Sequence, residues 1–189
     1  VVPLFNEESV IAETVSRLLI LKEKITEYNC ELIFVDDGST DHSLKILEKE
    51  ALENSCVKII SFSRNFGHQA ALTCGLEHFK GDACILMDAD FQDDPKYIKE
   101  LINEWDKGSE VVLARRLKRD DGFIKNILFG LFYKIQYYLS DVKIPKNVGH
   151  YSLMSNKVVE RINMLPEINR YINGLRAISS YKYTFVDVV

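Results

Sequence analysis

The sequence predicts an α/β fold with a mostly parallel central sheet and helices on both of its faces. Four short runs rich in strand-forming residues, at 31–35, 57–61, 83–87 and 110–114, begin 26, 26 and 27 residues apart. Between them lie segments whose apolar residues recur at helical spacing. Alternating strands and helices are typical of a parallel sheet. The strands read as nearly continuous apolar runs, as in sheets that are covered on both faces.

Each connecting segment carries a start signal for a helix. The apolar stripe over 11–25 follows Ser9, and the next stripe follows Asp41, so we expect both residues to act as N-caps. A third helix is predicted over 70–79 from its apolar spacing. The fourth begins at Pro95, because proline favours the first turn of a helix.

Composition and charge narrow the class of protein. The chain has 189 residues, of which 47% are hydrophobic and 28% charged, as in a soluble globular protein, and one domain spanning 1–189 is expected. The net charge of −4 argues against a nucleic-acid binder. Four widely spaced cysteines without a CxxC pair indicate buried free thiols. Because the chain starts without Met and ends in an expected strand, we interpret it as a fragment of a longer protein.

Acidic residues follow the predicted strand at 83–87. In open sheets of this kind, ligands bind outside the carboxyl ends of the strands, and Asp88-Ala89-Asp90 lies at such an end. Carboxylate oxygens suit Mg²⁺ or Mn²⁺, with water and substrate phosphates completing the coordination. A metal there would neutralise a diphosphate leaving group. The alternative is an ordinary solvated turn, since acidic residues are common in loops.

A second acidic loop, DDGSTD at 36–41, also joins a strand to a helix. Gly38 permits a tight turn, and the three residues after it can cap the helix. Adjacent carboxylates repel each other, so Asp36 and Asp37 are expected to serve binding rather than structure. A phosphoacceptor receiver domain also gathers carboxylates at strand ends. It would be complete in roughly 120 residues, which leaves the last third of this chain unexplained.

Four motifs occur in order: VVPLFNEE at 1–8, FVDDGSTD at 34–41, SRNFGHQAALTCG at 63–75 and MDADFQDDP at 87–95. With RYINGL at 170–175 they resemble the family 2 glycosyltransferases, which have the GT-A fold. The branch that the chain resembles most is the bacterial polyprenyl-phosphate glycosyltransferases, similar to bactoprenol glucosyltransferases. The resemblance implies metal-dependent, inverting transfer of a sugar from a nucleotide-sugar, with a UDP-sugar favoured, to a polyprenyl phosphate. Mg²⁺ or Mn²⁺ is the implied cofactor.

The resemblance also implies roles for individual residues. The nucleotide-sugar would contact Pro3, Phe5, Asn6, Glu7, Asp36, Asp37, Arg64, Asn65, Asp88, Gln92 and Asp93. Asp90, supported by Asp88, would hold the metal and so stabilise the charge that develops on the leaving diphosphate. Candidates for phosphate contacts on the acceptor side are Arg115, Arg116, Arg170 and Arg176, although each is more often a solvated charge.

One stretch departs from the pattern of the bacterial branch. Where that branch usually carries Gly-Asp-Phe-Arg-Leu, this chain has Gly149-His150-Tyr151-Ser152-Leu153. The acid, taken as the general base in many relatives, is replaced by His150, and the basic residue by Ser152. His150 is therefore a candidate base or a contact for the acceptor phosphate. The alternative is an ordinary residue in a relative that binds nucleotides without turnover.

The segment 123–139 carries apolar residues at helical spacing next to a basic run at 115–119. This pattern predicts an amphipathic helix on an anionic membrane surface, although a helix packed in the core has the same stripe. The resemblance places the full-length protein at the cytoplasmic face of the cell membrane, with spanning helices after the catalytic domain. It is compatible with a homo-oligomer. The alternative acceptor is a polysaccharide or a protein, with the aromatic helix buried.

Overall fold

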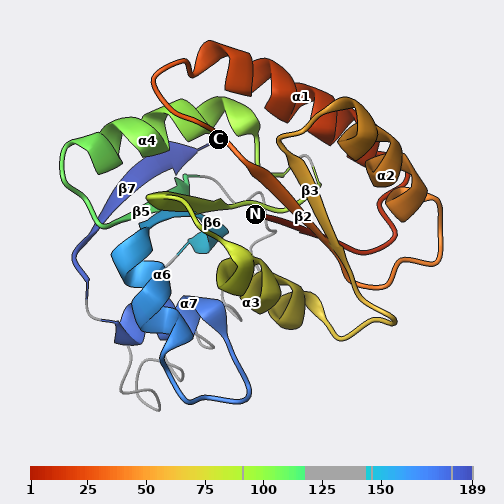
Figure 1. The fold of residues 1–189 in the computed structure, drawn as a ribbon. Coiled ribbons are helices and arrows are strands. Elements are labelled where there is room, and N and C mark those ends of the chain that lie inside the picture. The colour runs from red at the N-terminus through yellow and green to blue at the C-terminus, as the bar shows by residue number, and fades with distance from the viewer. Residues whose placement is uncertain (91, 118–143, 146, 180, 189) are drawn as a thin grey trace, which may run out of the picture.

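The computed structural model describes residues 1–90, 92–117, 144–145, 147–179 and 181–188 (Figure 1). The first half alternates strands and helices: β1 Val2–Leu4, α1 Ile11–Lys24, β2 Leu32–Asp36, α2 Ser43–Glu53, β3 Val57–Ser61, α3 His68–His78 and β4 Ala83–Leu86. The second half contains the 3-10 turn η1 Pro95–Tyr97, α4 Ile98–Asp106, β5 Val111–Arg116, β6 Val148–Ser155, α6 Asn156–Asn163, α7 Ile172–Ile178 and β7 Tyr183–Val188.

The strands form two sheets that meet at the start of the chain. Three parallel strands have the order β1-β2-β3, and four strands have the order β4-β6-β5-β7. Two backbone hydrogen bonds join these sheets, from the Val1 amine to the Ile85 oxygen at 2.7 Å and from the Met87 N–H to the Val1 oxygen at 3.2 Å. Among the strands that the structure describes, only β6 runs antiparallel to its neighbours, β4 and β5. The prediction of a mostly parallel sheet is therefore confirmed, with one antiparallel strand inserted.

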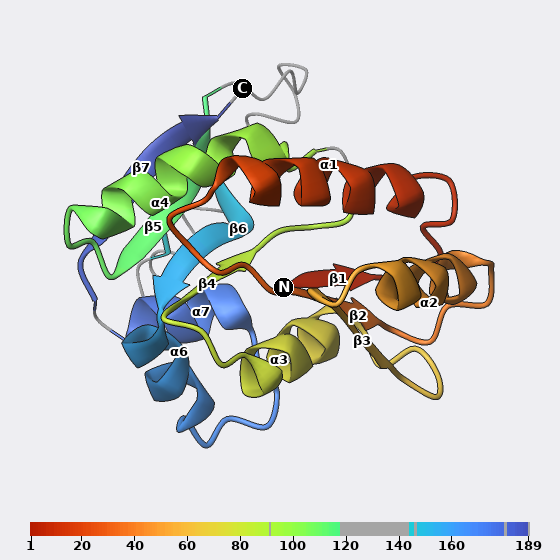
Figure 2. The same cartoon turned by 45° about the horizontal axis from the view of Figure 1, so that its top comes forward.

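Helices cover both faces of the sheet, as predicted (Figures 1 and 2). On one face, α1 and α4 pack their apolar residues, including Val15 and Leu101, against the strands. On the other face, α3, α6 and α7 bury Leu72, Ile162 and Leu175 in a second apolar cluster. Each face thus has its own core, and the loops at the strand ends are left at the edges.

The predicted start of the fourth helix is confirmed, but the two predicted N-caps are not. Pro95 is the first residue of η1, and the Asp94 side chain caps that turn by accepting a hydrogen bond from the Lys96 N–H at 2.9 Å. Asp41 lies one residue before His42, the N-cap position of α2, and its side chain accepts from the Ser43 N–H at 2.9 Å. Ser9 does not cap α1, because the N-cap position is Val10 and no side chain bonds there. Both N-cap predictions were wrong.

Several sequence predictions fall partly or wholly outside the described residues. The segment 123–139 lies there, as do the last two residues of the basic run 115–119. In the part of the chain that the structure describes, no helix combines the length and apolarity needed to span a bilayer. All four cysteines are free, as predicted, but only Cys84 is fully buried.

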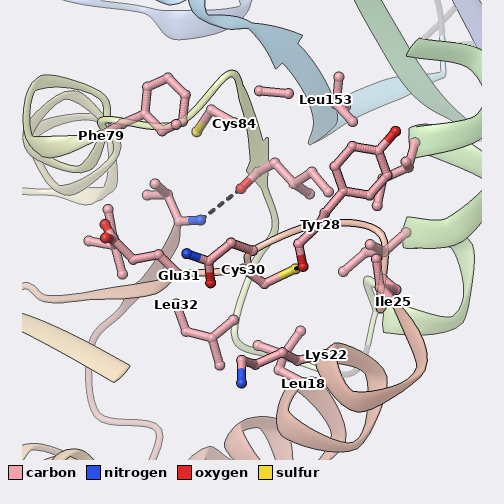
Figure 3. Close-up of a pocket in the computed structure, with 18 of the residues that line it drawn as sticks. Leu18, Lys22, Ile25, Tyr28, Cys30, Glu31, Leu32, Phe79, Cys84 and Leu153 are labelled. Atoms are coloured by element: carbon pink, nitrogen blue, oxygen red, sulfur yellow. Dashed lines mark hydrogen bonds between the residues drawn. The ribbon is translucent and has the colours of Figure 1, made fainter. Parts of the chain in front are cut away.

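A cavity of about 400 Å³ opens at the edge where β1, β2 and β4 begin (Figure 3). Its wall is mostly apolar and includes Leu18, Ile25 and Phe79. Val1 also lines it. The paired carboxylates lie at the opposite ends of these strands, so this cavity is not the candidate active site.

Candidate active site

A second cavity, of about 380 Å³, lies where β1, β2 and β4 end. It is lined from the loops after β1, β2, β3 and β4 and from the start of α3. Seven residues selected from the sequence meet in its wall: Pro3, Phe5, Glu7, Asp37, Asn65, Asp88 and Asp90. The structure therefore brings together the predicted nucleotide contacts, which come from three separate loops, and the predicted metal-binding pair.

Hydrogen bonds join the loop after β1 to the loop after β2. The Asn6 N–H donates to Ser39 Oγ at 2.9 Å, and Asn6 Oδ1 accepts from the Thr40 N–H at 2.8 Å. The Glu7 N–H donates to Ser43 Oγ at 2.8 Å. Asn6 adopts a left-handed conformation, with φ of 56°, that allows these bonds. Asn6 is outside the cavity wall, so its observed role is to position the neighbouring loop residues.

Asp36 and Asp37 are both buried and have structural partners, contrary to the prediction that they serve binding alone. Asp36 accepts hydrogen bonds from the Ser39 N–H and from Ser61 Oγ. Asp37 accepts from the N–H groups of Phe66 and Gly67 at 2.7 and 2.9 Å. Backbone donors from the next loop thus compensate the adjacent charges. Asp37 also lines the cavity, so it fixes the loop at 64–67 beside the space that a nucleotide would fill.

Among the carboxylates that line the cavity, Asp88 has the pKa that lies furthest from its ordinary value. Burial raises the pKa of Asp88 to about 6, and the negative charges of Asp93 and Asp90 add to this effect. The charge of His68 opposes it, with Nε2 3.5 Å from Asp88 Oδ1. That Oδ1 atom is buried, and the described residues give it no hydrogen-bond partner. A buried carboxylate oxygen without a donor is an open ligand position for a cation.

The residues present fit a divalent cation that is shared with a substrate. Asp90 faces the same cavity, and burial together with the charge of Asp90 raises the pKa of Glu7. Among the described residues, no group of three or more His, Cys, Asp or Glu side chains could hold a metal by itself. Mg²⁺ and Mn²⁺ sites that bind nucleotides commonly use one or two carboxylates, with phosphate and water as the other ligands.

Asp93 and Gln92 support the acidic loop rather than line the cavity. The Asp93 side chain is only 3% exposed and accepts from the Asp88 N–H at 3.0 Å. Arg116 donates to Asp93 Oδ1 at 3.2 Å and to Gln92 Oε1 at 3.1 Å. Burial raises the pKa of Asp93, whereas these hydrogen bonds oppose the rise. Arg116 therefore holds the loop from β5, and its prediction as a phosphate contact has no support in this arrangement.

Three other predicted arginines also lie outside the cavity wall. Arg115 makes two hydrogen bonds to Asp187 on β7, at 2.6 and 3.0 Å. Arg170 donates to the Ile162 oxygen at 2.6 Å and approaches Glu77, at the opposite end of α3 from the cavity. Arg64 places its guanidinium 4.4 Å from the centre of the Phe66 ring. The structure does not bring these three side chains to the site.

His150 lies beside the cavity, separated from Asp88 by His68. The His68 and His150 rings are 4.9 Å apart. Burial, followed by the charges of His68 and Arg176, lowers the pKa of His150 to about 4. A neutral imidazole with such a pKa is a weak general base near pH 7, which favours the reading of His150 as a contact. His68 itself was not selected from the sequence, although it sits in the third motif at the start of α3.

The lowered pKa of His150 predicts a loss of stability in acid. The unfolded chain takes up this proton near pH 6.5 and the folded chain only near pH 4, so the free energy of unfolding falls as the pH drops through that window. In His150→Asn this contribution disappears, and the fall between pH 6.5 and 4 should be shallower than in the wild type. Urea unfolding at pH 7, 5.5 and 4.5 measures both slopes, and equal slopes would contradict the assignment.

Comparison with known proteins identifies the family of this chain. The model of the family described as glycosyl transferase family 2 matches residues 1–162. An uncharacterized glycosyltransferase, YkcC, of Bacillus subtilis is 43% identical over all of this chain and 58% of its own length. A bactoprenol glucosyl transferase of Shigella phage SfX is 41% identical over 93% of this chain and 57% of its own length. The chain thus spans less than two thirds of these relatives.

Solved structures share the fold at low identity. A mannosyltransferase of Pyrobaculum calidifontis, in complex with GDP-Man and Mn²⁺, superposes with a TM-score of 0.67 at 19% identity, over 98% of this chain and 53% of that one. Glucosyl-3-phosphoglycerate synthase of Mycobacterium tuberculosis, with Mn²⁺ and UDP, gives a TM-score of 0.57 at 20% identity, over 98% and 67%. The predicted GT-A fold is confirmed, and the chain belongs to glycosyl transferase family 2.

Proposed function

We propose that this chain transfers a sugar from a nucleotide-sugar, with a UDP-sugar favoured, to a polyprenyl phosphate at the cytoplasmic face of the cell membrane. The transfer is metal-dependent and inverts the anomeric centre. The observation that carries the proposal is the cavity in which Asp88 and Asp90 face the loops after β1 and β2, with the Asp88 Oδ1 atom buried and without a hydrogen-bond partner among the described residues. The bactoprenol glucosyl transferases among the relatives support the lipid acceptor. Association with the membrane surface and a homo-oligomer belong to the same proposal.

The protein contributes mainly orientation and electrostatics. Phe5, Asp37 and Asn65 line the part of the cavity built by the loops after β1, β2 and β3, and these residues would hold the nucleoside. Asp88 and Asp90 lie on the β4 side, where the diphosphate would bind. A divalent cation bound by these two carboxylates would neutralise the charge on the leaving diphosphate. Both solved neighbours named above contain Mn²⁺, which supports a divalent ion here.

The reaction is a single displacement. An oxygen of the acceptor phosphate attacks the anomeric carbon from the face opposite the nucleoside diphosphate, a new carbon–oxygen bond forms, and the bond to the diphosphate breaks. The leaving group takes both electrons of that bond. A phosphate monoester has a second pKa of about 6, so the acceptor is already mostly anionic near pH 7. The chain therefore needs no strong base, which agrees with the lowered pKa of His150.

The direct test is a transfer assay with the full-length protein. Labelled UDP-, GDP- and dTDP-sugars are each offered with Mn²⁺ and undecaprenyl phosphate in detergent, and the lipid fraction is counted. We expect labelled lipid from one donor, lost when EDTA is added. Label that appears in an added polysaccharide or protein, and not in the lipid, would refute the lipid acceptor. Nucleotide binding without turnover on any acceptor would refute catalysis.

A further inference from the structure

A buried guanidinium lies next to the candidate active site without a carboxylate partner. Arg176 on α7 is 5% exposed, and within the described part of the chain no Asp or Glu forms an ion pair with it. Its Nη1 donates to Ser152 Oγ at 2.7 Å, and its Nη2 donates to the Gly149 oxygen at 3.2 Å. Both partners are neutral. Since a buried charge is costly unless it is paired, this cation is suited to an anionic ligand.

Near Arg176 lies a buried N–H donor, on His150, that has no hydrogen-bond partner among the described residues. The Ile172 N–H donates to Gln69 Oε1 at 2.9 Å, which fixes the orientation of the Gln69 amide. The Gln69 Nε2 amide then faces His150 Nε2 at 3.3 Å and must donate to it. The hydrogen of the neutral imidazole is therefore on Nδ1. That atom is buried and has no hydrogen-bond partner among the described residues.

The contacts of β6 place both donors near the carboxylate pair. His150 contacts Gln69 and His68 of α3, and Ser152 accepts from Arg176 of α7. Ser152 pairs with Leu86, the last residue of β4, and Asp88 follows two residues after it. The His68 ring, 4.9 Å from the His150 ring, lies between His150 and Asp88. An anion held here would lie one strand away from the predicted metal-binding pair.

We propose that the Arg176 guanidinium and the His150 Nδ1–H form an anion subsite that binds the phosphate group of the acceptor. The inference rests on the proposed function and assigns its acceptor side. Arg176 brings to Ser152 the positive charge that the resemblance leads one to expect at residue 152 itself. Arg115, Arg116 and Arg170 are engaged elsewhere, which leaves Arg176 as the arginine selected from the sequence that lies at this position.

The test separates the acceptor phosphate from the donor phosphates. In the full-length protein, KM for undecaprenyl phosphate and the affinity for UDP with Mn²⁺ are measured for Arg176→Gln, Arg176→Lys and His150→Leu. A charge-assisted hydrogen bond predicts that Arg176→Gln raises the acceptor KM roughly 10- to 100-fold, with a smaller effect for Arg176→Lys. UDP affinity should change less than about twofold, within ordinary mutational scatter. Arg161→Gln, which removes an exposed charge on α6, is the matched control.

Further variants keep the test decisive when Arg176→Gln folds poorly. The double variant Ser152→Arg with Arg176→Ser moves the guanidinium to β6 and should recover acceptor KM. His150→Asn, whose amide can donate near the position of Nδ1, should exceed His150→Leu in acceptor affinity. As a binding probe, farnesyl phosphate should compete with the acceptor in the wild type and lose most of its effect in Arg176→Gln, whereas farnesol should not compete in either.

Three results would overturn the subsite. UDP affinity could fall by the same factor as acceptor affinity, which would assign the phosphate to the donor. The acceptor KM could stay unchanged in Arg176→Gln. The variant could lower only the melting temperature, which would leave a structural role. Failure of the proposed function looks different: the wild-type protein would transfer no sugar to the lipid, while farnesyl phosphate binding would still depend on Arg176.

Discussion

Asp90→Asn is expected to lower sugar transfer by roughly 10³-fold or more while the fold stays intact, since it removes one of the two carboxylates predicted to hold the metal. Within the described residues, the Asp90 side chain accepts one hydrogen bond that holds little structure, from the Gln92 N–H at 3.3 Å. The free energy of unfolding should therefore change by less than about 1 kcal/mol. Initial rates at saturating donor and acceptor, with Mn²⁺ titrated, measure the loss.

Asp94→Asn is the matched control for that variant. It removes a carboxylate from the same loop, but one that caps η1 and pairs with Lys96 outside the cavity wall. Asparagine caps a helix about as well as aspartate, so this control should keep its stability and most of its transfer rate. An Asp90→Asn enzyme that retains wild-type turnover and the same Mn²⁺ dependence would show that the metal is not held by this pair.

Gly38→Ala is expected to destabilise the protein by about 2–4 kcal/mol and to weaken nucleotide binding. Gly38 has a φ of +70°, and a Cβ atom there would lie 2.3 Å from the backbone carbon of Arg64. Because that contact is with backbone, the loop at 64–67 has to move. The movement breaks the hydrogen bonds that Asp37 accepts from Phe66 and Gly67 and so opens the cavity wall. Urea unfolding and UDP titration measure the two effects.

Gly108→Ala is the control that separates backbone strain from the steric clash expected in Gly38→Ala. Gly108 also has a positive φ, of +96°, but nothing lies within 4 Å of an added Cβ. It should lose only the conformational penalty, about 1–2 kcal/mol, and bind UDP normally. Equal stability losses at both glycines, with UDP affinity unchanged at both, would contradict the close packing of the loops at 36–41 and 64–67.

Local sequence patterns predicted the parallel half of the fold well. The strand at 57–61 was predicted with the bounds that the structure has, and the start of η1 at Pro95 follows from the fixed φ of proline. The place of the antiparallel β6 between β4 and β5 was not predicted, because it depends on pairing with strands more than thirty residues away. Pairing between strands that are far apart in the sequence does not show in the local pattern of residues.

The candidate site was likewise predicted only in part from the sequence. Carboxylates at strand ends were found from their position alone, and Asp88 and Asp90 do share a cavity. The hydrogen bonds that Asp36 and Asp37 accept within the fold were not predicted, because their donors belong to segments that come close only in the folded chain. Arg115 could not be judged either, because its partner Asp187 is 72 residues away. For the same reason the bond between Arg176 and Ser152 appears only in the folded chain.

Thermal unfolding of the chain with UDP and Mn²⁺, each alone and both together, tests the central claim most directly. A ligand at about 100 times its dissociation constant stabilises by about 2.7 kcal/mol. In a domain of this size, that corresponds to a rise in melting temperature of roughly 5–10 °C. We predict this rise only when nucleotide and metal are both present, and its loss in Asp90→Asn. No rise with UDP, GDP or dTDP, or the same rise without metal, would contradict the claim that Asp88 and Asp90 bind a metal–nucleotide complex.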